Sequence, residues 1–487
     1  MFITCFLSVT DILTDGKKGV AADFHWEWDA NPVLFTTVLG ESVARWFLLE
    51  VFLLGDFGCR MVRSAEAASQ SLYPQSHCGN AKDVGDMIKD PTMFFSKNAL
   101  NMKRSEIREL LKVTRQPDMI SFAGGFPGPE TFPVKDFEEI ACQVMREKGI
   151  LAMQYGPTEG EKPLREEIAK WLRREKTTIA PENILVTAGS QQGLDIVAKV
   201  FLDPGDIVIV ELPSYIGGLQ AFAAYRAEMI GVEQDDEGMR MDMLEKTLEK
   251  LARKGKKPKF IYVVPDFQNP SGATMPLERR KKLLELAYKY ELPIVEDSPY
   301  RDLRYRGQPV PAIYSLDTQN QVIVLGTFSK LLSPGLRLGW IMASAEWLDR
   351  MIVAKQSMDL CSPTFTQLIA AEYLEQGKLP PQIENIRRAY GRKLEVMLKA
   401  LEKYMPKGVE WSKPEGGLFL WVRLPGKISA NDLLPKAIGN KVVYVVGTAF
   451  HCDGKGQNAM RLNFSYPTEQ QIDAGVQRLA TMIKENA

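Results

Sequence analysis

A lysine and an arginine seven residues apart follow one of the buried strands that the sequence predicts. Lys330 comes after the apolar run 322–325, and Arg337 lies on the same loop. A lysine that is partly desolvated beside a second cation has a lowered pKa, and its neutral amine can form a Schiff base. An arginine suits a phosphate because its planar guanidinium donates paired hydrogen bonds. The pair indicates a nucleophilic amine beside an anion site; the alternative is an ordinary solvated lysine.

A Gly/Ser turn and a tyrosine follow two other predicted strands. The turn Gly189-Ser190 follows strand 184–187 and opens a helix. The free N–H groups and the positive end of the helix dipole suit a phosphate, whereas serine is also an ordinary N-cap. Tyr215 follows strand 207–211, where its ring can stack on a planar ligand or serve only in packing.

An amide and a carboxylate follow two further strands. Asn269 comes after strand 260–264, in a turn whose Asn, Pro, Ser and Gly residues also suit a purely structural role. Asp297 follows strand 292–296, and a carboxylate at the end of a buried strand is costly unless it is paired. A protonated ring nitrogen is one such partner; an N-cap or a salt bridge is the alternative.

Together, the residues after these five strands indicate a site for pyridoxal 5′-phosphate (PLP). Open α/β sheets bind their ligands beyond the carboxyl ends of the strands, so we expect these side chains to meet at one edge of the sheet. They combine a phosphate turn, a stacking ring, an amide, a carboxylate and a Lys/Arg pair. PLP uses a Schiff-base lysine and an acidic partner for its pyridine nitrogen.

The elements that must position these residues follow an α/β pattern. Helical periods separate most of the apolar runs, which predicts a mostly parallel, seven-stranded sheet. The seven runs are 184–187, 207–211, 228–232, 260–264, 292–296, 322–325 and 340–343. A smaller α+β domain is predicted from two long helices at 365–375 and 381–404 and from shorter strands at 418–424, 442–446 and 460–464.

The predicted organisation has four parts. Residues 1–86 carry 6 basic and 11 acidic residues, a net charge of −5, and are interpreted as an extension outside the catalytic fold. Residues 87–135 are expected to form an N-terminal helix, at 107–113, and a substrate-side loop. Residues 136–364 are predicted to be the large PLP-binding domain, and residues 365–487 the small C-terminal domain.

Composition disfavours several other functions. The 61 Lys+Arg balance the 61 Asp+Glu, whereas nucleic-acid-binding proteins usually carry a basic excess. The three histidines (His25, His77 and His451) and six cysteines without a CxxC pair disfavour a metal site, a Ser-His-Asp triad and a secreted disulfide framework. No apolar stretch of about 18 residues lacks charges, so we expect no membrane span. A reduced, cytoplasmic protein fits these features.

Residues 91–487 resemble the fold-type I PLP-dependent aminotransferases, and especially the 2-aminoadipate/kynurenine subgroup with its broad-specificity prokaryotic relatives. The resemblance covers roughly four fifths of the chain, with the motifs in family order. They are SEIREL (105–110), AGGFPGPETFP (123–133), QYGPTEG (154–160), GSQQGLD (189–195), QNPSG (268–272), EDSPY (296–300), SKLLSPGLRLG (329–339), PEGGLFLW (414–421) and RLNFS (461–465). The chain departs from the pattern at Val446, where family members commonly have proline, and residues 1–86 have no counterpart.

The resemblance implies a role for each matching residue. Lys330 forms the Schiff base and moves the proton, Asp297 keeps the ring nitrogen protonated, and Tyr215 stacks on the ring. The implied cofactor ligands are Ser190, Gln191, Tyr215, Asn269, Asp297, Tyr300, Ser329, Lys330 and Arg337. The implied substrate-side residues are Arg108, Gly125, Phe126, Tyr155, Asn269 and Arg461, with Arg461 gripping the α-carboxylate, Tyr155 reaching over from the partner of a homodimer, and Arg108 gating the site.

The resemblance also implies a ping-pong transfer of the amino group from an L-amino acid to a 2-oxo acid, with 2-oxoglutarate as the expected acceptor. Three alternatives stay open. A PLP-dependent lyase or another PLP reaction uses the same fold and cofactor site. A PLP-fold transcription regulator requires a basic DNA-binding head, which the acidic residues 1–86 disfavour. A PLP-independent binding protein is disfavoured by Lys330, Asp297 and Arg461.

Overall fold

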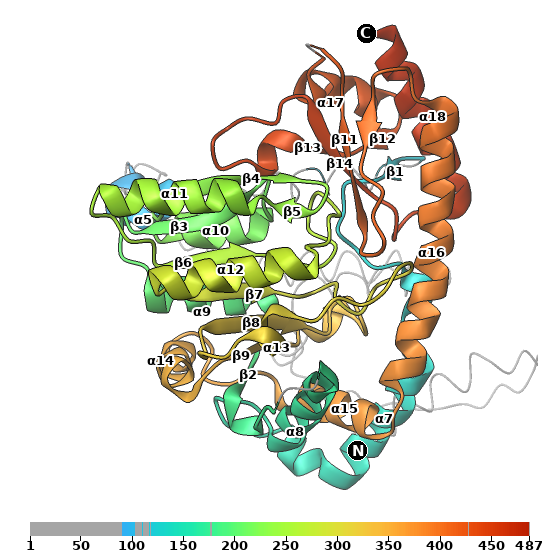
Figure 1. Cartoon of the computed structure of the whole chain (residues 1–487). Coiled ribbons are helices and arrows are strands. Elements are labelled where there is room, and N and C mark those ends of the chain that lie inside the picture. The colour runs from blue at the N-terminus through green and yellow to red at the C-terminus, as the bar shows by residue number, and fades with distance from the viewer. Residues whose placement is uncertain are drawn as a thin grey trace, which may run out of the picture. The chain divides into compact units, whose positions relative to one another are not determined.

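A mixed eight-stranded sheet carries most of the predicted site residues (Figure 1). The computed structural model describes residues 90–102, 110, 116, 118–175, 178–426 and 428–486. The neighbouring strands from β8 to β4 pair in parallel, whereas β9 runs antiparallel to β2 and β8, and β5 antiparallel to β4. In pairing order, the strands are β2 (Ile184–Thr187), β9 (Gly339–Met342), β8 (Val322–Thr327), β7 (Ile294–Asp297), β6 (Phe260–Val263), β3 (Ile207–Leu212), β4 (Glu228–Asp235) and β5 (Gly238–Met239).

The predicted fold class is confirmed, with one strand added. All seven predicted strands are present, and the central strands β6, β7 and β8 are buried along their whole length, as expected for parallel strands covered on both faces. The eighth strand, β5, has only 2 residues and begins at Gly238, whose φ of 85° turns the chain back onto β4. Two residues are too few to show a period of alternation, so the pattern contained no signal for β5.

Helices cover both faces of this sheet (Figure 1). Helix α11 shows why: Leu244, Leu248 and Leu251 are buried at helical spacing, and charged residues occupy the outer face. Helices α9 (Ser190–Phe201) and α10 (Ile216–Ala224) pack on one face, and α14 (Ala345–Gln356) packs beside α9. The other face carries α11 (Met241–Arg253), α12 (Leu277–Tyr290) and α13 (Ile313–Leu316).

A second, four-stranded antiparallel sheet lies in the C-terminal part of the chain, as predicted for a smaller α+β layer. Its pairing order is β10 (Glu410–Trp411), β11 (Phe419–Arg423), β14 (Ala459–Asn463) and β13 (Val445–Val446). The helices in this part of the chain are α16 (Leu379–Tyr404), α17 (Ala430–Gly439) and α18 (Glu469–Glu485), of which α16 and α18 pack together. The two-residue strand β1 (Ile120–Ser121) pairs in parallel with β12 (Val442–Val443), which ties the substrate-side loop to this layer.

The remaining helices are α5 (Lys97–Asn101), α7 (Val134–Ala152), α8 (Lys162–Leu172) and α15 (Thr364–Glu375), of which α15 packs on α7 and α8. The extension 1–86 lies outside the described residues, as does most of the helix predicted at 107–113. The domain boundaries at 135 and 364 stay predictions. No helix among the described residues combines the length and the apolar character that a membrane span requires.

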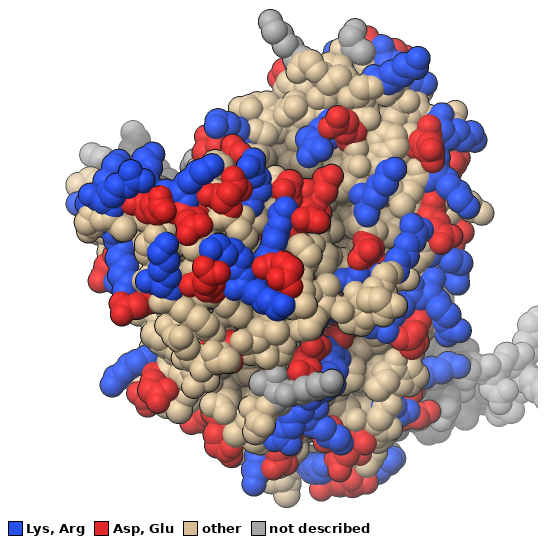
Figure 2. Space-filling model, in the orientation of Figure 1, with Lys and Arg blue, Asp and Glu red and all other residues tan. Residues whose placement is uncertain are grey.

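Basic and acidic side chains are interspersed on the face of the molecule in Figure 2. Exposed ion pairs on α11 and α12 illustrate this mixture, for example Lys289–Glu245 and Lys281–Glu278. Such pairs contribute little to stability individually. The pattern agrees with the zero net charge of the sequence.

Candidate active site

One cavity of about 650 Å³ brings together nearly all of the predicted site residues. It opens beyond the carboxyl ends of the parallel strands, where ligands of open α/β sheets bind. Its lining includes Gly125, Phe126, Ser190, Gln191, Tyr215, Asn269, Asp297, Tyr300, Ser329, Lys330, Arg337 and Arg461. Of the predicted substrate-side residues, Tyr155 does not line it, and Arg108 lies outside the described residues.

Lys330 lies in the loop after β8 and is partly buried. Its Nζ atom donates a 2.8 Å hydrogen bond to the backbone oxygen of Gly125. Burial, followed by the positive charges of Arg461 and Arg337, lowers the pKa of Lys330 to about 8. A substantial fraction of this amine is therefore neutral near physiological pH, which is the form that attacks a carbonyl carbon.

The N-terminus of α9 offers donors that suit an anion. The first N–H groups of a helix have no intrahelical partner, and here they belong to Ser190 and Gln191. Gly189 precedes them with a φ of 83°, and a Cβ atom there would come within 2.8 Å of Nη2 of Arg337. Glycine thus leaves room for the guanidinium, which donates a 2.6 Å hydrogen bond to the oxygen of Ala188. Ser329, whose N–H donates to Thr327 Oγ1 at 3.1 Å, lines the same cavity.

Asp297 ends β7 as a buried carboxylate with one oxygen engaged. Its side chain is 2% exposed, and Oδ2 accepts a 2.9 Å hydrogen bond from the hydroxyl of Tyr262. Oδ1 is buried and has no hydrogen-bond partner among the described residues. Burial raises the pKa of Asp297 to about 7, and the hydrogen bond from Tyr262 opposes that increase. A buried oxygen without a partner is costly, so this atom calls for a donor supplied by a ligand.

Asn269 connects two other site residues. Its amide nitrogen is 3.4 Å from the hydroxyl of Tyr300, and its Oδ1 accepts a 2.9 Å hydrogen bond from Nη1 of Arg461. Both polar ends of this buried amide are therefore oriented by neighbours from β14 and from the loop after β7.

Arg461 comes from β14 of the second sheet and is 1% exposed. Nη2 donates a 2.6 Å hydrogen bond to the oxygen of Ala123, and the guanidinium lies 4.1 Å from the ring centre of Phe419 and 5.1 Å from that of Phe450. Burial lowers the pKa of Arg461 to about 10, so the group stays charged at neutral pH. A guanidinium has about five N–H donors, so donors remain for a carboxylate.

Two contributors were missed in the sequence. Tyr262 lies inside β6, and Phe419 opens β11, so neither follows a predicted strand of the first sheet. The sequence offered one signal for Tyr262. Its hydroxyl is the polar group in the otherwise apolar run 260–264, and such a group needs a hydrogen-bond partner once it is buried. Phe419 belongs to the motif at 414–421, but its contact with Arg461 requires the tertiary structure.

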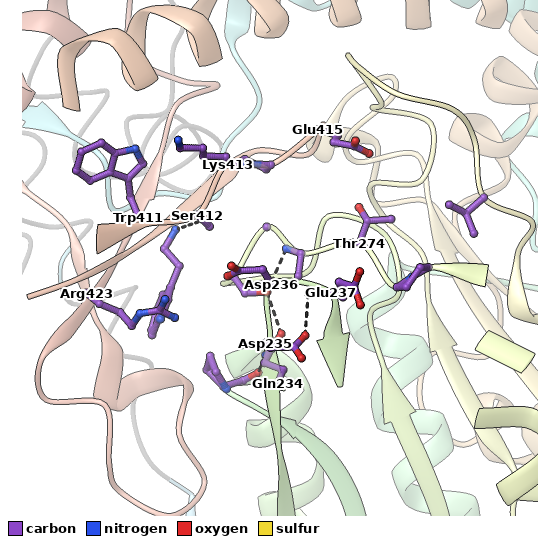
Figure 3. A pocket seen from close by; sticks show the side chains of 18 residues that line it. Gln234, Asp235, Asp236, Glu237, Thr274, Trp411, Ser412, Lys413, Glu415 and Arg423 are labelled. Carbon is purple, nitrogen blue, oxygen red and sulfur yellow. Dashed lines mark hydrogen bonds between the residues drawn. The ribbon is translucent and has the colours of Figure 1, made fainter. Parts of the chain in front are cut away.

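A second cavity of about 630 Å³ lies on the other side of the loop that follows Asn269. Figure 3 shows the acidic turn of Asp235, Asp236 and Glu237 on one side and Trp411, Lys413 and Arg423 on the other. Arg279 pairs with both Asp235 and Glu237, so much of the acidic charge of this turn is balanced locally. The nucleophilic amine lines the first cavity, which is therefore the candidate active site.

The residues of this cavity fit PLP. The unpartnered Oδ1 of Asp297 matches a protonated ring nitrogen, and the amine of Lys330 matches an aldehyde. The helix N-terminus with Arg337 matches a dianionic phosphate. Three chemically different groups of the cofactor thus each meet a suitable partner in one cavity.

Comparisons with known proteins point to the same chemistry. The chain is 48% identical over 409 residues to aromatic-amino-acid aminotransferase 1 of Thermococcus litoralis, which spans 83% of this chain and 98% of that protein. The solved kynurenine aminotransferase of Pyrococcus horikoshii is 48% identical, with a TM-score of 0.80 over 82% of this chain and 99% of that one. The α-aminoadipate aminotransferase LysN of Thermus thermophilus, solved with N-(5′-phosphopyridoxyl)-L-leucine, is 40% identical, with a TM-score of 0.76 over 81% and 98%.

The family model described as aminotransferase class I and II matches residues 124–479, which include every described residue of the cavity named above. These similarities support the aminotransferase interpretation over the lyase, regulator and binding-protein alternatives. The chain therefore belongs to the class I and II aminotransferases of PLP fold-type I and is a PLP-dependent transaminase.

Proposed function

We propose that Lys330, Asp297 and Tyr215 are the catalytic residues of this transaminase. The observation that carries the proposal is that one cavity is lined both by a lysine with a lowered pKa and by an aspartate that has one buried oxygen without a partner. PLP, when bound, would supply an aldehyde for the substrate amino group and an electron sink for the bonds at the substrate Cα. Lys330, as the neutral amine, takes the proton from the substrate Cα and delivers it to C4′ of the cofactor. Tyr215 stacks on the ring and limits its tilt.

The remaining cofactor ligands divide between the two ends of the ring. Ser190, Gln191, Ser329 and Arg337 hold the phosphate, with the N-terminus of α9 adding its dipole. Asn269 and Tyr300 hold the phenolic oxygen of the ring; their 3.4 Å contact supports a shared target. Asp297 holds the ring nitrogen, since charge-assisted hydrogen bonds are the stronger ones.

Arg461 binds the α-carboxylate of the substrate through a bidentate pair of hydrogen bonds. Its support is the burial of the guanidinium between Phe419 and Phe450, which excludes water from the pair. Gly125 and Asn269 contact the same end of the substrate. Arg108 stays a predicted gating residue outside the described part of the chain.

We infer that aromatic or other apolar L-amino acids are the preferred donors and that 2-oxoglutarate is the acceptor. The cavity is lined on the substrate side by Phe126, Ile216 and Phe419. Apolar and aromatic lining favours apolar side chains. The names of two relatives, an aromatic-amino-acid aminotransferase and a kynurenine aminotransferase, also refer to aromatic substrates.

The working form is proposed to be a homodimer with shared active sites. Ile150 and Tyr155 are 94% and 77% exposed, and Met153 and Leu151 beside them are also exposed. A contiguous apolar patch of this kind marks a protein–protein contact. A second copy that covers this patch brings Tyr155 to the partner's cavity, which accounts for its absence from the lining of its own. Location in the cytoplasm stays a prediction.

An absorbance experiment tests the proposed function. The purified protein loaded with PLP is expected to show a visible band that bleaches when an aromatic L-amino acid is added and returns with 2-oxoglutarate. Comparing donors one at a time ranks their preference in the same cuvette. Release of ammonia or CO2 from the amino acid alone would contradict transamination, and a band insensitive to aromatic donors but bleached by others would contradict the proposed preference.

A further inference from the structure

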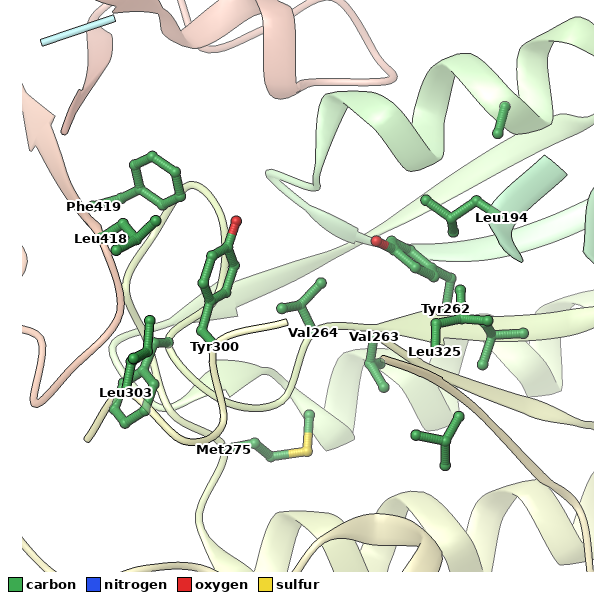
Figure 4. Packing of buried hydrophobic residues seen from close by; sticks show 14 of the residues in the cluster. Leu194, Tyr262, Val263, Val264, Met275, Tyr300, Leu303, Leu325, Leu418 and Phe419 are labelled. Atoms are coloured by element: carbon green, nitrogen blue, oxygen red, sulfur yellow. The ribbon is translucent and has the colours of Figure 1, made fainter. Parts of the chain in front are cut away.

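A buried tyrosine that follows none of the strand ends donates a side-chain hydrogen bond to Asp297. Tyr262 projects from β6 toward α10, and Val263 points to the opposite face of the strand (Figure 4). The Tyr262 side chain is fully buried, and its hydroxyl donates to Oδ2 of Asp297 at 2.9 Å. No cofactor contact of its own is needed for this residue to affect the cofactor.

We propose that Tyr262 is a positioning residue, whose hydroxyl fixes Oδ2 of Asp297 so that Oδ1 faces the ring nitrogen of the cofactor. The proposal rests on the role proposed for Asp297. A carboxylate can rotate about its terminal torsion, which is broad and roughly two-fold. One donor on Oδ2 selects one orientation, and the oxygen without a partner is then Oδ1.

The surroundings hold Tyr262 in a single orientation. Its ring packs edge-on against Phe222 of α10 at a centroid distance of 5.3 Å. A Cβ atom built on Gly218 of the same helix would lie 3.1 Å from the ring and 3.2 Å from its hydroxyl oxygen. Gly218 therefore leaves just enough space for this hydroxyl, and a larger residue there would displace it.

The ionisable neighbours of Asp297 support the same conclusion. Glu211 on β3 is also buried, and Tyr300 lies on the loop after β7. Burial, and to a smaller extent the charge of Asp297, raises the pKa of Glu211, and burial raises the pKa of Asp297. The two acids repel each other when both are ionised, so one of them loses its proton first. The hydrogen bond from Tyr262 lowers the pKa of Asp297 and so favours ionisation of Asp297, the acid that faces the cofactor.

Binding of pyridoxamine 5′-phosphate to the full-length apoprotein tests this role without turnover. This probe has the same ring nitrogen but no aldehyde, so it does not react with Lys330. In Tyr262→Phe, loss of a charge-assisted hydrogen bond is expected to weaken binding about tenfold or more. The pKa of Asp297 rises in this variant, so the ratio of its dissociation constant to that of the wild type is largest at acidic pH and falls as the pH rises. Measuring both proteins in a Glu211→Gln background removes the titration of Glu211.

Two controls separate positioning from packing. Tyr444→Phe removes another buried hydroxyl, which donates to the oxygen of Ala430, and should leave probe binding and its pH profile unchanged. In an Asp297→Asn background, Tyr262→Phe should weaken probe binding little further, because the carboxylate charge that the Tyr262 hydroxyl stabilises is gone. An equal loss in both backgrounds, or a Tyr262→Phe protein that binds the probe like the wild type, would overturn the proposal.

Gly218→Ala offers a second route if Tyr262→Phe does not fold. It keeps the hydroxyl but displaces it, so the same pH-dependent weakening is expected at a smaller magnitude, with a matching change in the visible absorbance of the loaded enzyme. A Gly218→Ala protein whose probe binding has an unchanged pH profile would contradict the positioning role of Tyr262. A wild-type protein that binds no probe at all would instead refute the proposed cofactor site, so the two failures are distinguishable.

Discussion

Asn269 and Arg461, which lie 192 residues apart in the chain, share a hydrogen bond of 2.9 Å across the boundary between the two sheets. The amide belongs to the loop after β6, and the guanidinium belongs to β14. The same amide contacts Tyr300 at 3.4 Å. The groups proposed for the cofactor oxygen and for the substrate carboxylate are therefore in direct contact.

Replacing Arg461 is expected to weaken substrate binding selectively. Arg461→Ala removes the paired donors for the α-carboxylate, so KM for amino and oxo acids should rise about tenfold to hundredfold. Arg461→Lys keeps the charge but not the paired geometry, so its KM should lie between those of the wild type and Arg461→Ala. Steady-state kinetics with both substrates measure this. An unchanged KM in Arg461→Ala would place the carboxylate contact elsewhere.

Replacing Lys330 is expected to stop the reaction without unfolding the protein. Lys330→Ala should lower kcat by at least about a thousandfold, because the proton at Cα then has no general base. Its loop is also held by the backbone hydrogen bond from Leu331 N–H to Phe328 O, so the thermal melting temperature should change little. Turnover at the wild-type rate would refute the assignment.

Capture of PLP by the apoprotein is expected to depend on pH through Lys330. Only the neutral amine attacks the aldehyde, so the rate constant should rise about tenfold per pH unit below the pKa and level off above about 8. Of the two arginine charges that lower this pKa, that of Arg461 has the larger effect. Arg461→Met should therefore move the midpoint to higher pH. Stopped-flow absorbance measures the profile, and a midpoint near 10.5 would contradict the desolvated environment.

A mixture of two variants, each of which is expected to have lowered activity, tests the shared site. In a mixed dimer of Lys330→Ala and Tyr155→Phe, one cavity combines an intact Lys330 with an intact Tyr155 from the other chain. If Tyr155 acts across the interface, activity should exceed that of either variant after joint refolding. If Tyr155 acts within its own chain, no cavity is complete and no activity returns. Sedimentation of the wild type checks that the dimer exists.

Gly189→Ala is expected to weaken phosphate binding. Its positive φ disfavours alanine by about 1–2 kcal/mol, and the added Cβ would press on the guanidinium of Arg337. The dissociation constant for PLP should rise roughly tenfold, as measured by fluorescence. Gly205→Ala is a matched control, because Gly205 also has a positive φ, of 92°, with open space around its Cβ position. Equal effects of both substitutions on PLP binding would contradict this explanation.

The sequence was most informative where burial and strand ends coincide. The apolar runs that became β2, β6, β7 and β8 are buried throughout, so their boundaries were visible to within about two residues. Asp297 and Lys330 follow such strands, and the edge of the sheet brought them together as expected. Apolar periodicity alone did not mark the start of α9, because the first turn of this helix, from Ser190, is polar.

Other features depend on tertiary contacts that no local pattern encodes. Tyr262 acts through Asp297, 35 residues later, and the contact exists only because β6 and β7 are neighbours in the sheet. The cation–π contacts of Arg461 join β14 to Phe419 of β11 in the same way. The place of Tyr155 in a dimer requires a second chain, which a single sequence cannot supply.

The antiparallel strand β9 has a consequence for how the enzyme retains its cofactor between turnovers. Because β9 returns directly beside β8, Ser329, Lys330 and Arg337 all lie on the single connection 328–338 between these two strands. The residues proposed as the covalent anchor and as part of the phosphate anchor therefore share one connection of the chain. Arg461, on the other sheet and outside that connection, can exchange one carboxylate for the next. With the proposed roles, retention of the coenzyme and release of the product depend on separate layers of the same molecule.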